Sequence, residues 1–218
     1  MADLDFFFDP VCPFAWVTSR WVARVAELRD LEVDWRFISL RMVNAERDYD
    51  KEFPPGYVDG HTRGLELLRV AAATRDGHGN EAVGRLYASY GAVIWDAPGG
   101  LEGTLRRRGD LASVEPVLAA ADLPVELARA VGDDTWDPVI RAETDEALRR
   151  TGKDVGTPII TYGPPDGLSL FGPVISRVPG DDEAVELWDA VATLARFEGF
   201  AELKRSRREP LALAALGA

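Results

Sequence analysis

A strand–helix–strand pattern in residues 4–38 constrains the fold of this chain most strongly. Leu4–Phe8 is short and almost wholly apolar, which is typical of a strand buried on both faces. From Pro13 onward, apolar residues recur at three- and four-residue spacings, as they do on one face of a helix. Residues 32–38 then alternate apolar and polar side chains, which predicts a second strand. The two strands should be parallel and joined by a right-handed crossover.

The middle of the chain carries a different pattern. Residues 45–56 are polar and end in Pro54-Pro55-Gly56, which predicts a loop leaving the sheet. From there to about residue 151 the apolar spacing is helical, and no segment has a convincing strand pattern. We therefore predict an inserted helical subdomain at residues 45–151.

Sheet patterns return after the insertion. Residues 157–162 resemble a strand, a Gly- and Pro-rich turn follows, and residues 168–171 return as its hairpin partner. A final helix should begin at Asp181, where acidic residues in the first turn complement the helix dipole. The order β-α-β, helical insertion, β-β-α is that of an α/β thioredoxin-like fold, with residues 1–44 and 152–218 forming the thioredoxin-like domain.

Cys12 is the only cysteine in 218 residues. It follows the first predicted strand and directly precedes Pro13, so it should cap the first helix. Unpaired N–H groups and the helix dipole both favour a thiolate there. Asp9 opposes this effect, because a nearby carboxylate disfavours a second negative charge. We expect a net shift towards an acidic thiol, whereas a lone cysteine without this context is usually a small buried hydrophobe.

Composition excludes several function classes. The net charge of −12 argues against nucleic acid as a partner, and the cluster Arg106-Arg107-Arg108 fits a solvated helix end. The acidic N-terminus and the lack of a long apolar run predict a cytoplasmic protein. His61 and His78 stand in turn-like segments, so we expect no metal site. No nucleotide-binding or hydrolase motif is present.

Several separated motifs resemble one family. They are Phe8-Asp9-Pro10-Val11-Cys12-Pro13 with Trp16, Thr18-Ser19-Arg20-Trp21, Asp154-Val155-Gly156-Thr157-Pro158, Phe171-Gly172-Pro173-Val174, Leu187-Trp188-Asp189 and Glu202-Leu203-Lys204-Arg205. In this order, over nearly the whole length, the chain resembles the DsbA-like thioredoxin superfamily and, more narrowly, the actinobacterial mycothiol-dependent nitroreductases.

The resemblance implies roles for individual residues. Cys12 corresponds to the nucleophilic cysteine, with Pro13 beside it. The pair Thr157-Pro158 corresponds to the cis-proline loop that packs against the active-site sulfur. Phe14 takes the place of a pocket tryptophan, and Asn44 and Tyr57 match positions that line the pocket. From local sequence alone, Asn44 would be a loop cap, Tyr57 a packing aromatic and Pro158 an ordinary trans proline opening a strand.

The departure from the family pattern is Ala15, which stands where relatives carry the second, resolving cysteine of Cys-Pro-Trp-Cys. Any disulfide of Cys12 must then be intermolecular, with a small thiol, a protein thiol or a second copy of the chain, and a homodimer is one such arrangement. This predicts a monothiol oxidoreductase or thiol transferase, regenerated by mycothiol or, in another host, glutathione.

Two other interpretations stay open. Kappa-type glutathione transferases and chromene-carboxylate isomerases use one residue at this helix start to hold a cofactor thiolate, and Cys12→Ser could preserve activity of that kind. A non-enzymatic redox-sensing or binding module is the third interpretation. A Cys12 pKa near 8.5 or higher, measured by alkylation, would favour it over catalysis.

Overall fold

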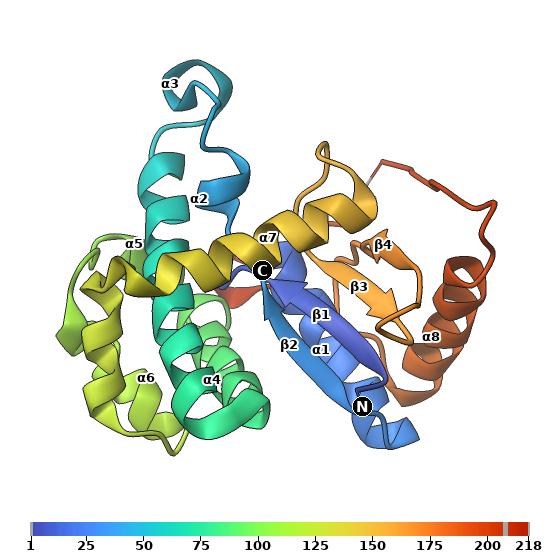
Figure 1. Cartoon of the computed structure of the whole chain (residues 1–218), viewed down its shortest axis with the longest axis horizontal. Helices are drawn as coiled ribbons and strands as arrows, with labels where there is room; N and C mark the ends of the chain where they lie inside the picture. Colours follow the sequence, from blue (N-terminus) through green and yellow to red (C-terminus); the bar gives the residue numbers. More distant parts are fainter. Residues whose placement is uncertain (1, 207–208, 218) are drawn as a thin grey trace.

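The computed structural model describes residues 2–206 and 209–217. Four strands form one sheet in the order β2-β1-β3-β4 (Figure 1). They are β1 (Leu4–Phe8), β2 (Val33–Phe37), β3 (Ile159–Tyr162) and β4 (Ser169–Phe171). The first two strands are parallel, as predicted, and β3 runs antiparallel to both β1 and β4. The fold is α/β and thioredoxin-like, with helices inserted between β2 and β3.

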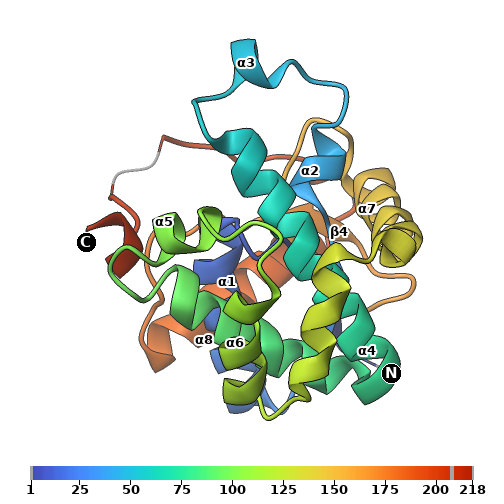
Figure 2. The same ribbon diagram turned by 90° about the vertical axis from the view of Figure 1, so that its left-hand side faces the viewer.

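The helices differ widely in length. The long ones are α1 (Pro13–Arg29), α4 (Tyr57–Ile94), α7 (Asp137–Thr151) and α8 (Asp181–Ala195). The short ones are α2 (Leu40–Val43), α3 (Tyr49–Glu52), α5 (Gly100–Leu105), α6 (Glu115–Ala120) and the 3₁₀ helices η1 (Leu111–Ser113), η2 (Val125–Gly132), η3 (Asp134–Trp136) and η4 (Ala214–Leu216). The loop predicted at residues 45–56 therefore contains one turn of helix, α3, which projects from the molecule (Figures 1 and 2).

Side chains of β1 alternate between the two faces of the sheet, as strand geometry requires. Leu4, Phe6 and Phe8 belong to the main core, which includes buried residues of α1, α4 and α8. Phe7 faces the other way, into a smaller cluster with Ala147 of α7. Because both faces are covered, β1 can be almost wholly apolar.

Strand β2 lies at the edge of the sheet, where unpaired backbone groups would invite pairing with another chain. Side chains of the inserted helices form hydrogen bonds with these backbone groups instead. The N–H of Trp35 donates to Asn80 Oδ1 at 2.8 Å, and the Asn80 amide donates back to the Trp35 carbonyl at 2.9 Å. The N–H of Phe37 donates to Glu143 Oε2 at 2.8 Å. The inserted helices thus complete this edge.

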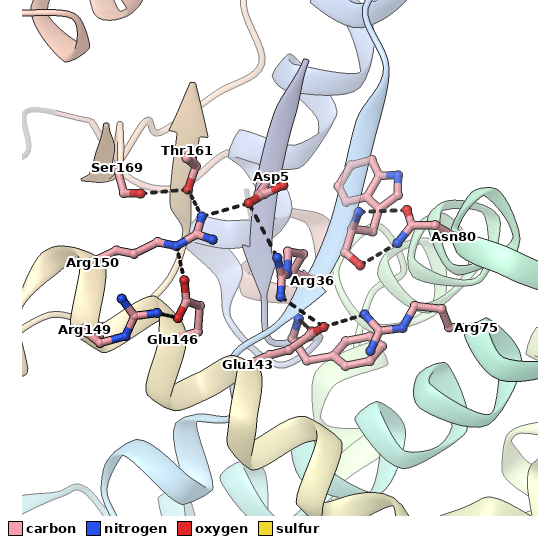
Figure 3. Close-up of polar contacts among 12 residues, drawn as sticks. Asp5, Arg36, Arg75, Asn80, Glu143, Glu146, Arg149, Arg150, Thr161 and Ser169 are labelled. Atoms are coloured by element: carbon pink, nitrogen blue, oxygen red, sulfur yellow. Dashed lines mark hydrogen bonds and ion pairs between the residues drawn. The ribbon is translucent and has the colours of Figure 1, made fainter. Parts of the chain in front are cut away.

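Further ion pairs and hydrogen bonds connect α4 and α7 with the strands of the sheet (Figure 3). Arg75 of α4 and Arg36 of β2 both donate to Glu143 Oε1, at 2.8 and 3.4 Å. Arg150 donates to Asp5 Oδ2 and to Thr161 Oγ1, each at 2.8 Å. Helix α7 is therefore tied to strands β1, β2 and β3, although it lies within residues 45–151. The division at residues 44 and 151 stays a prediction, and Met1, Arg207, Arg208 and Ala218 lie outside the described residues.

Replacing Glu143 by glutamine should destabilise the protein by about 2 kcal/mol, because the half-buried Arg75 loses its anionic partner and Arg36 keeps only Asp5. Glutamine keeps the volume and one acceptor oxygen, so the loss reports mainly the charge. The control is Glu81→Gln, because the Glu81 side chain is 93% exposed and, among the described residues, forms an ion pair only with Arg85. It should cost less than about 0.5 kcal/mol. Urea unfolding measures both, and equal effects would contradict the assignment.

Within the described residues, none of the helices is long and apolar enough to cross a membrane.

Candidate functional site

Cys12 is the N-cap residue of α1, as the sequence predicts. The residue is 6% exposed and lies directly before the first turn of the helix, which begins at Pro13. The Ala15 N–H donates to Cys12 Sγ at 3.4 Å. The sulfur therefore occupies the capping position that a serine or aspartate oxygen often takes.

The loop before β3 approaches the same sulfur from the other side. Cys12 Sγ donates to the carbonyl oxygen of Thr157 at 3.3 Å, across 145 residues of sequence. Thr157 is held in turn by its hydroxyl, which donates to the Phe7 carbonyl of β1 at 2.8 Å. Pro158 is buried, and the Thr157–Pro158 peptide bond is cis. The structure thus brings Cys12, Pro13, Thr157 and Pro158 together.

Ala15 is fully buried in the first turn of α1. Its backbone N–H points at the Cys12 sulfur, so position 15 lies directly beside the thiol. Cys12 is free, and no second cysteine exists in the sequence.

The prediction of an acidic thiol is wrong for this structure. Burial raises the pKa of Cys12 to about 12, and the nearby Asp9 carboxylate also raises it. The N–H groups of Ala15 and Phe14 lower it, as expected at a helix start, but they do not offset burial. The Cys12 thiol donates a hydrogen bond to the Thr157 carbonyl, which it can do only when protonated, in agreement with the raised pKa. Helix position alone could not reveal this, because burial depends on the loop at residue 157 and on the insertion.

Asp9 is the buried charge of the site. Its carboxylate is fully buried and accepts the N–H groups of Val11 at 3.0 Å and Leu40 at 2.8 Å. No described residue forms an ion pair with it, and burial raises its pKa to about 7 against the lowering effect of these two hydrogen bonds. A Cβ atom at Gly64 of α4 would lie 2.4 Å from Asp9 Oδ1, so only glycine fits there. Asp9 thus joins the Cys12 loop, α2 and the insertion.

The other pocket residues named from the sequence are more scattered. Phe14 is half-buried in the first turn of α1, next to Cys12. Asn44 is buried, and its amide donates to the Leu40 carbonyl at 2.8 Å, so it caps α2. Tyr57 is 46% exposed at the start of α4. Within the described part of the chain, neither Asn44 nor Tyr57 hydrogen bonds to Cys12 or Thr157. Their roles in a pocket stay predictions.

A family model described as mycothiol-dependent nitroreductase Rv2466c matches residues 11–205, which include the Cys12 loop, the Thr157 loop and the whole insertion. The chain belongs to the Rv2466c-like family.

Individual relatives agree with this assignment. The chain is 30% identical over 209 residues to uncharacterized protein Rv2286c of Mycobacterium tuberculosis, covering 95% of this chain and 83% of the relative. Two solved structures are similar at lower identity. Cytosolic disulfide reductase DsbM from Pseudomonas aeruginosa has 17% identity, a TM-score of 0.54 and coverage of 88% and 99%. A 2-hydroxychromene-2-carboxylate isomerase has 18% identity, a TM-score of 0.53 and coverage of 88% and 96%. At these identities the likeness shows the fold alone.

Sequence reasoning missed one cluster in this Rv2466c-like chain. His61 is not in a loop but on α4, where it is 8% exposed and hydrogen bonds through Nδ1 to the Tyr49 hydroxyl at 2.9 Å. Phe53 and Tyr57 pack around it, with ring centroids 5.8 and 5.6 Å from the imidazole. Burial, followed by the charge of Arg41, lowers the pKa of His61 to about 4, so the ring is neutral at physiological pH. In the sequence, only the aromatic residues at positions 49, 53 and 57 could have indicated this cluster.

Metal-binding geometry is not found in the Rv2466c-like site. Among residues 2–206 and 209–217, no three His, Cys, Asp or Glu side chains are placed to hold an ion together.

Proposed function

We propose that the chain is a thiol-dependent oxidoreductase that works through Cys12 alone. The observation that carries this proposal is the arrangement at α1. The Cys12 sulfur lies between the Ala15 N–H and the Thr157 carbonyl, while a buried alanine occupies the position three residues on. A sulfur held this way can form one disulfide bond, and no neighbour can break it.

The proposed cycle has two exchange steps. After losing its proton, Cys12 attacks the small-thiol sulfur of a mixed disulfide between that small thiol and another thiol. A new S–S bond joins Cys12 to the small thiol, and the old S–S bond breaks with its electron pair on the other thiol, which takes up a proton and leaves in reduced form. A second reduced thiol then attacks the mixed disulfide, restores Cys12 and leaves as a symmetrical disulfide. With a reactive electrophile in place of the disulfide, the second thiol would instead take the bound group from Cys12, which leaves as a thiolate, and the product would be a conjugate of the small thiol. The family description supports mycothiol as the thiol, with glutathione the counterpart in another host.

Burial raises the pKa of Cys12 to about 12, above 8.5, which by itself favours the non-enzymatic interpretation, so the proposal rests on the geometry around the sulfur and not on its acidity. The same raised pKa sets the expected pH dependence. The thiolate is the nucleophile, and its fraction grows with pH below the thiol pKa. Adduct formation should therefore accelerate from pH 7 to pH 9, by about tenfold for each pH unit.

Intact mass spectrometry tests the proposal. Wild type and Cys12→Ser are incubated separately with oxidised mycothiol and oxidised glutathione. We expect one mycothiol adduct on wild type, less with glutathione, and none on Cys12→Ser. Absence of an adduct with either disulfide, at pH 7 and at pH 9, would contradict the proposal.

The same pKa favours a second candidate function. A protonated Cys12 can donate a hydrogen bond to a bound thiolate, as it now donates to Thr157. The chain would then activate a cofactor thiol for transfer or isomerisation without redox change at Cys12. Cys12→Ser separates the candidates, because a serine hydroxyl can still donate this bond but cannot form a disulfide.

Cytoplasmic location, the absence of nucleic-acid partners and assembly as a homodimer belong to the same proposal. The net charge of −12 supports the second of these. Reduction of nitro compounds, which the family description names, would need the substrate to accept electrons that the small thiol ultimately supplies.

A further inference from the structure

A cavity of about 250 Å³ lies within the helical insertion, away from the residues of the Cys12 site. Its walls come from both ends of α4, from α5 and from the start of α6, helices that face the viewer in Figure 2. Residues 9–16, 41–57 and 157–158 do not line it. The cavity is small compared with typical ligand pockets of 300–1,000 Å³. It would suit a compact molecule.

The lining combines an apolar wall with positive charge. Leu67, Ile94, Val114 and Val117 provide apolar surface, and Thr104 and Ser113 provide hydroxyl groups. The charged residues of the lining are Arg63 and Arg107, with no aspartate or glutamate. This is unusual local chemistry in a chain with a net charge of −12. The combination favours an amphipathic anion over a neutral or cationic ligand.

Arg63 is the buried arginine of the lining. Its side chain is 2% exposed, and its guanidinium donates to Glu66 Oε2 at 2.8 Å and to Ser113 Oγ at 2.7 Å. Its Nε atom is buried without a hydrogen-bond partner among the described residues. An unsatisfied buried donor is costly. Glu66 already balances the charge of Arg63, so the unbalanced positive charge of the lining is that of Arg107.

Arg107 is the accessible cation at the cavity. It belongs to the arginine cluster at residues 106–108, and its two neighbours are occupied elsewhere. Arg106 pairs with Glu102, and Arg108 pairs with Asp59. Arg107 lines the cavity and forms no ion pair with any residue that the structure describes. The sequence predicted a solvated helix end for all three arginines, but Arg107 differs from the other two because it lines the cavity and is not in an ion pair with a described residue.

We propose that this cavity binds a small monocarboxylate with a compact ring or branched apolar body. The carboxylate pairs with Arg107, and the apolar body packs against Leu67, Ile94 and Val117. The site is separate from the chemistry of Cys12 and does not depend on the proposed function.

Calorimetric titration with benzoate tests the proposal. We expect saturable binding with a dissociation constant on the order of 1 mM or lower, given the few atoms of the ligand. Benzamide keeps the ring without the charge, and acetate keeps the charge without the ring. Each should bind about tenfold more weakly, because each lacks one of the two contributions.

Paired variants locate the site. Arg107→Gln should weaken benzoate binding about tenfold, whereas Arg106→Gln, with the same charge change one residue away, should stay within about twofold of wild type. Circular dichroism checks that both variants are folded. No saturable benzoate binding by wild type, equal binding of benzamide, equal binding of acetate, or equal losses in the two variants would each overturn the proposal.

Discussion

Replacing Ala15 by cysteine should give the protein the ability to release its own mixed disulfide. The new thiol would stand three residues after Cys12 in the first turn of α1, where the residue 15 N–H already lies 3.4 Å from the Cys12 sulfur. Attack by this thiol is intramolecular, and well-oriented intramolecular reactions gain large effective concentrations. We expect release without added thiol to become at least about 100-fold faster than in wild type. The product is an internal disulfide, two hydrogens lighter than the reduced protein.

The matched control is Ala23→Cys, which adds a cysteine to the same helix. Residue 23 lies about 16 Å from Cys12 along the helix axis. Its thiol cannot reach Cys12, so the mixed disulfide should persist as in wild type. Because Ala15 is fully buried, the extra sulfur should cost roughly 1–3 kcal/mol of stability, and both variants need a folding check. If Ala15→Cys retains the mixed disulfide as long as wild type does, position 15 is not the resolving position.

Replacing Asp9 by asparagine should make Cys12 more acidic. Asp9 ionises with a pKa of about 7, and its negative charge raises the pKa of Cys12. Removing that charge leaves burial as the main raising effect. We expect the Cys12 pKa to fall by about one unit and alkylation at pH 8 to become about tenfold faster. The pH dependence of iodoacetamide alkylation measures both quantities.

Asp9→Asn should also change how stability depends on pH. Burial raises the Asp9 pKa from 3.8 to about 7, so the folded state binds a proton that the unfolded state releases. Wild type should therefore lose stability as pH rises from about 4 through about 7, and the variant should lack this component. Asparagine presents an amide to one of two backbone donors, which should cost about 1–3 kcal/mol at every pH. Asp5→Asn is the control, because Asp5 lies on β1, four residues before Asp9, and pairs with Arg150. It should leave Cys12 alkylation unchanged.

The sequence was most informative where a pattern was strong and local. Alternation in residues 32–38 and the apolar run at Leu4–Phe8 predicted a parallel strand pair, and Cys12-Pro13 predicted a capped helix start. These features depend on nearest neighbours and on the periods of strand and helix. The contact between Cys12 and Thr157 could be expected only from a family resemblance, because 145 residues separate them.

Tertiary contacts decided what the sequence could not. The acidity of Cys12 depends on its burial, to which the Thr157 loop contributes, and on Asp9, against which Gly64 of α4 packs. His61 was interpreted as a turn residue because Asp59-Gly60-His61 favours turns locally, yet it lies in α4 against Tyr49. Gly79, with φ of 80°, interrupts α4 and allows Asn80 to reach β2, which no local pattern indicated.

The central claim is that Cys12 forms a disulfide that only a second molecule can resolve. The most direct test isolates the wild-type protein carrying one mycothiol on Cys12 and follows its intact mass with and without added reduced mycothiol. We predict that the adduct persists without added thiol and disappears, at a rate proportional to thiol concentration, when reduced mycothiol is present. Loss of the adduct at the same rate in both samples would contradict the account.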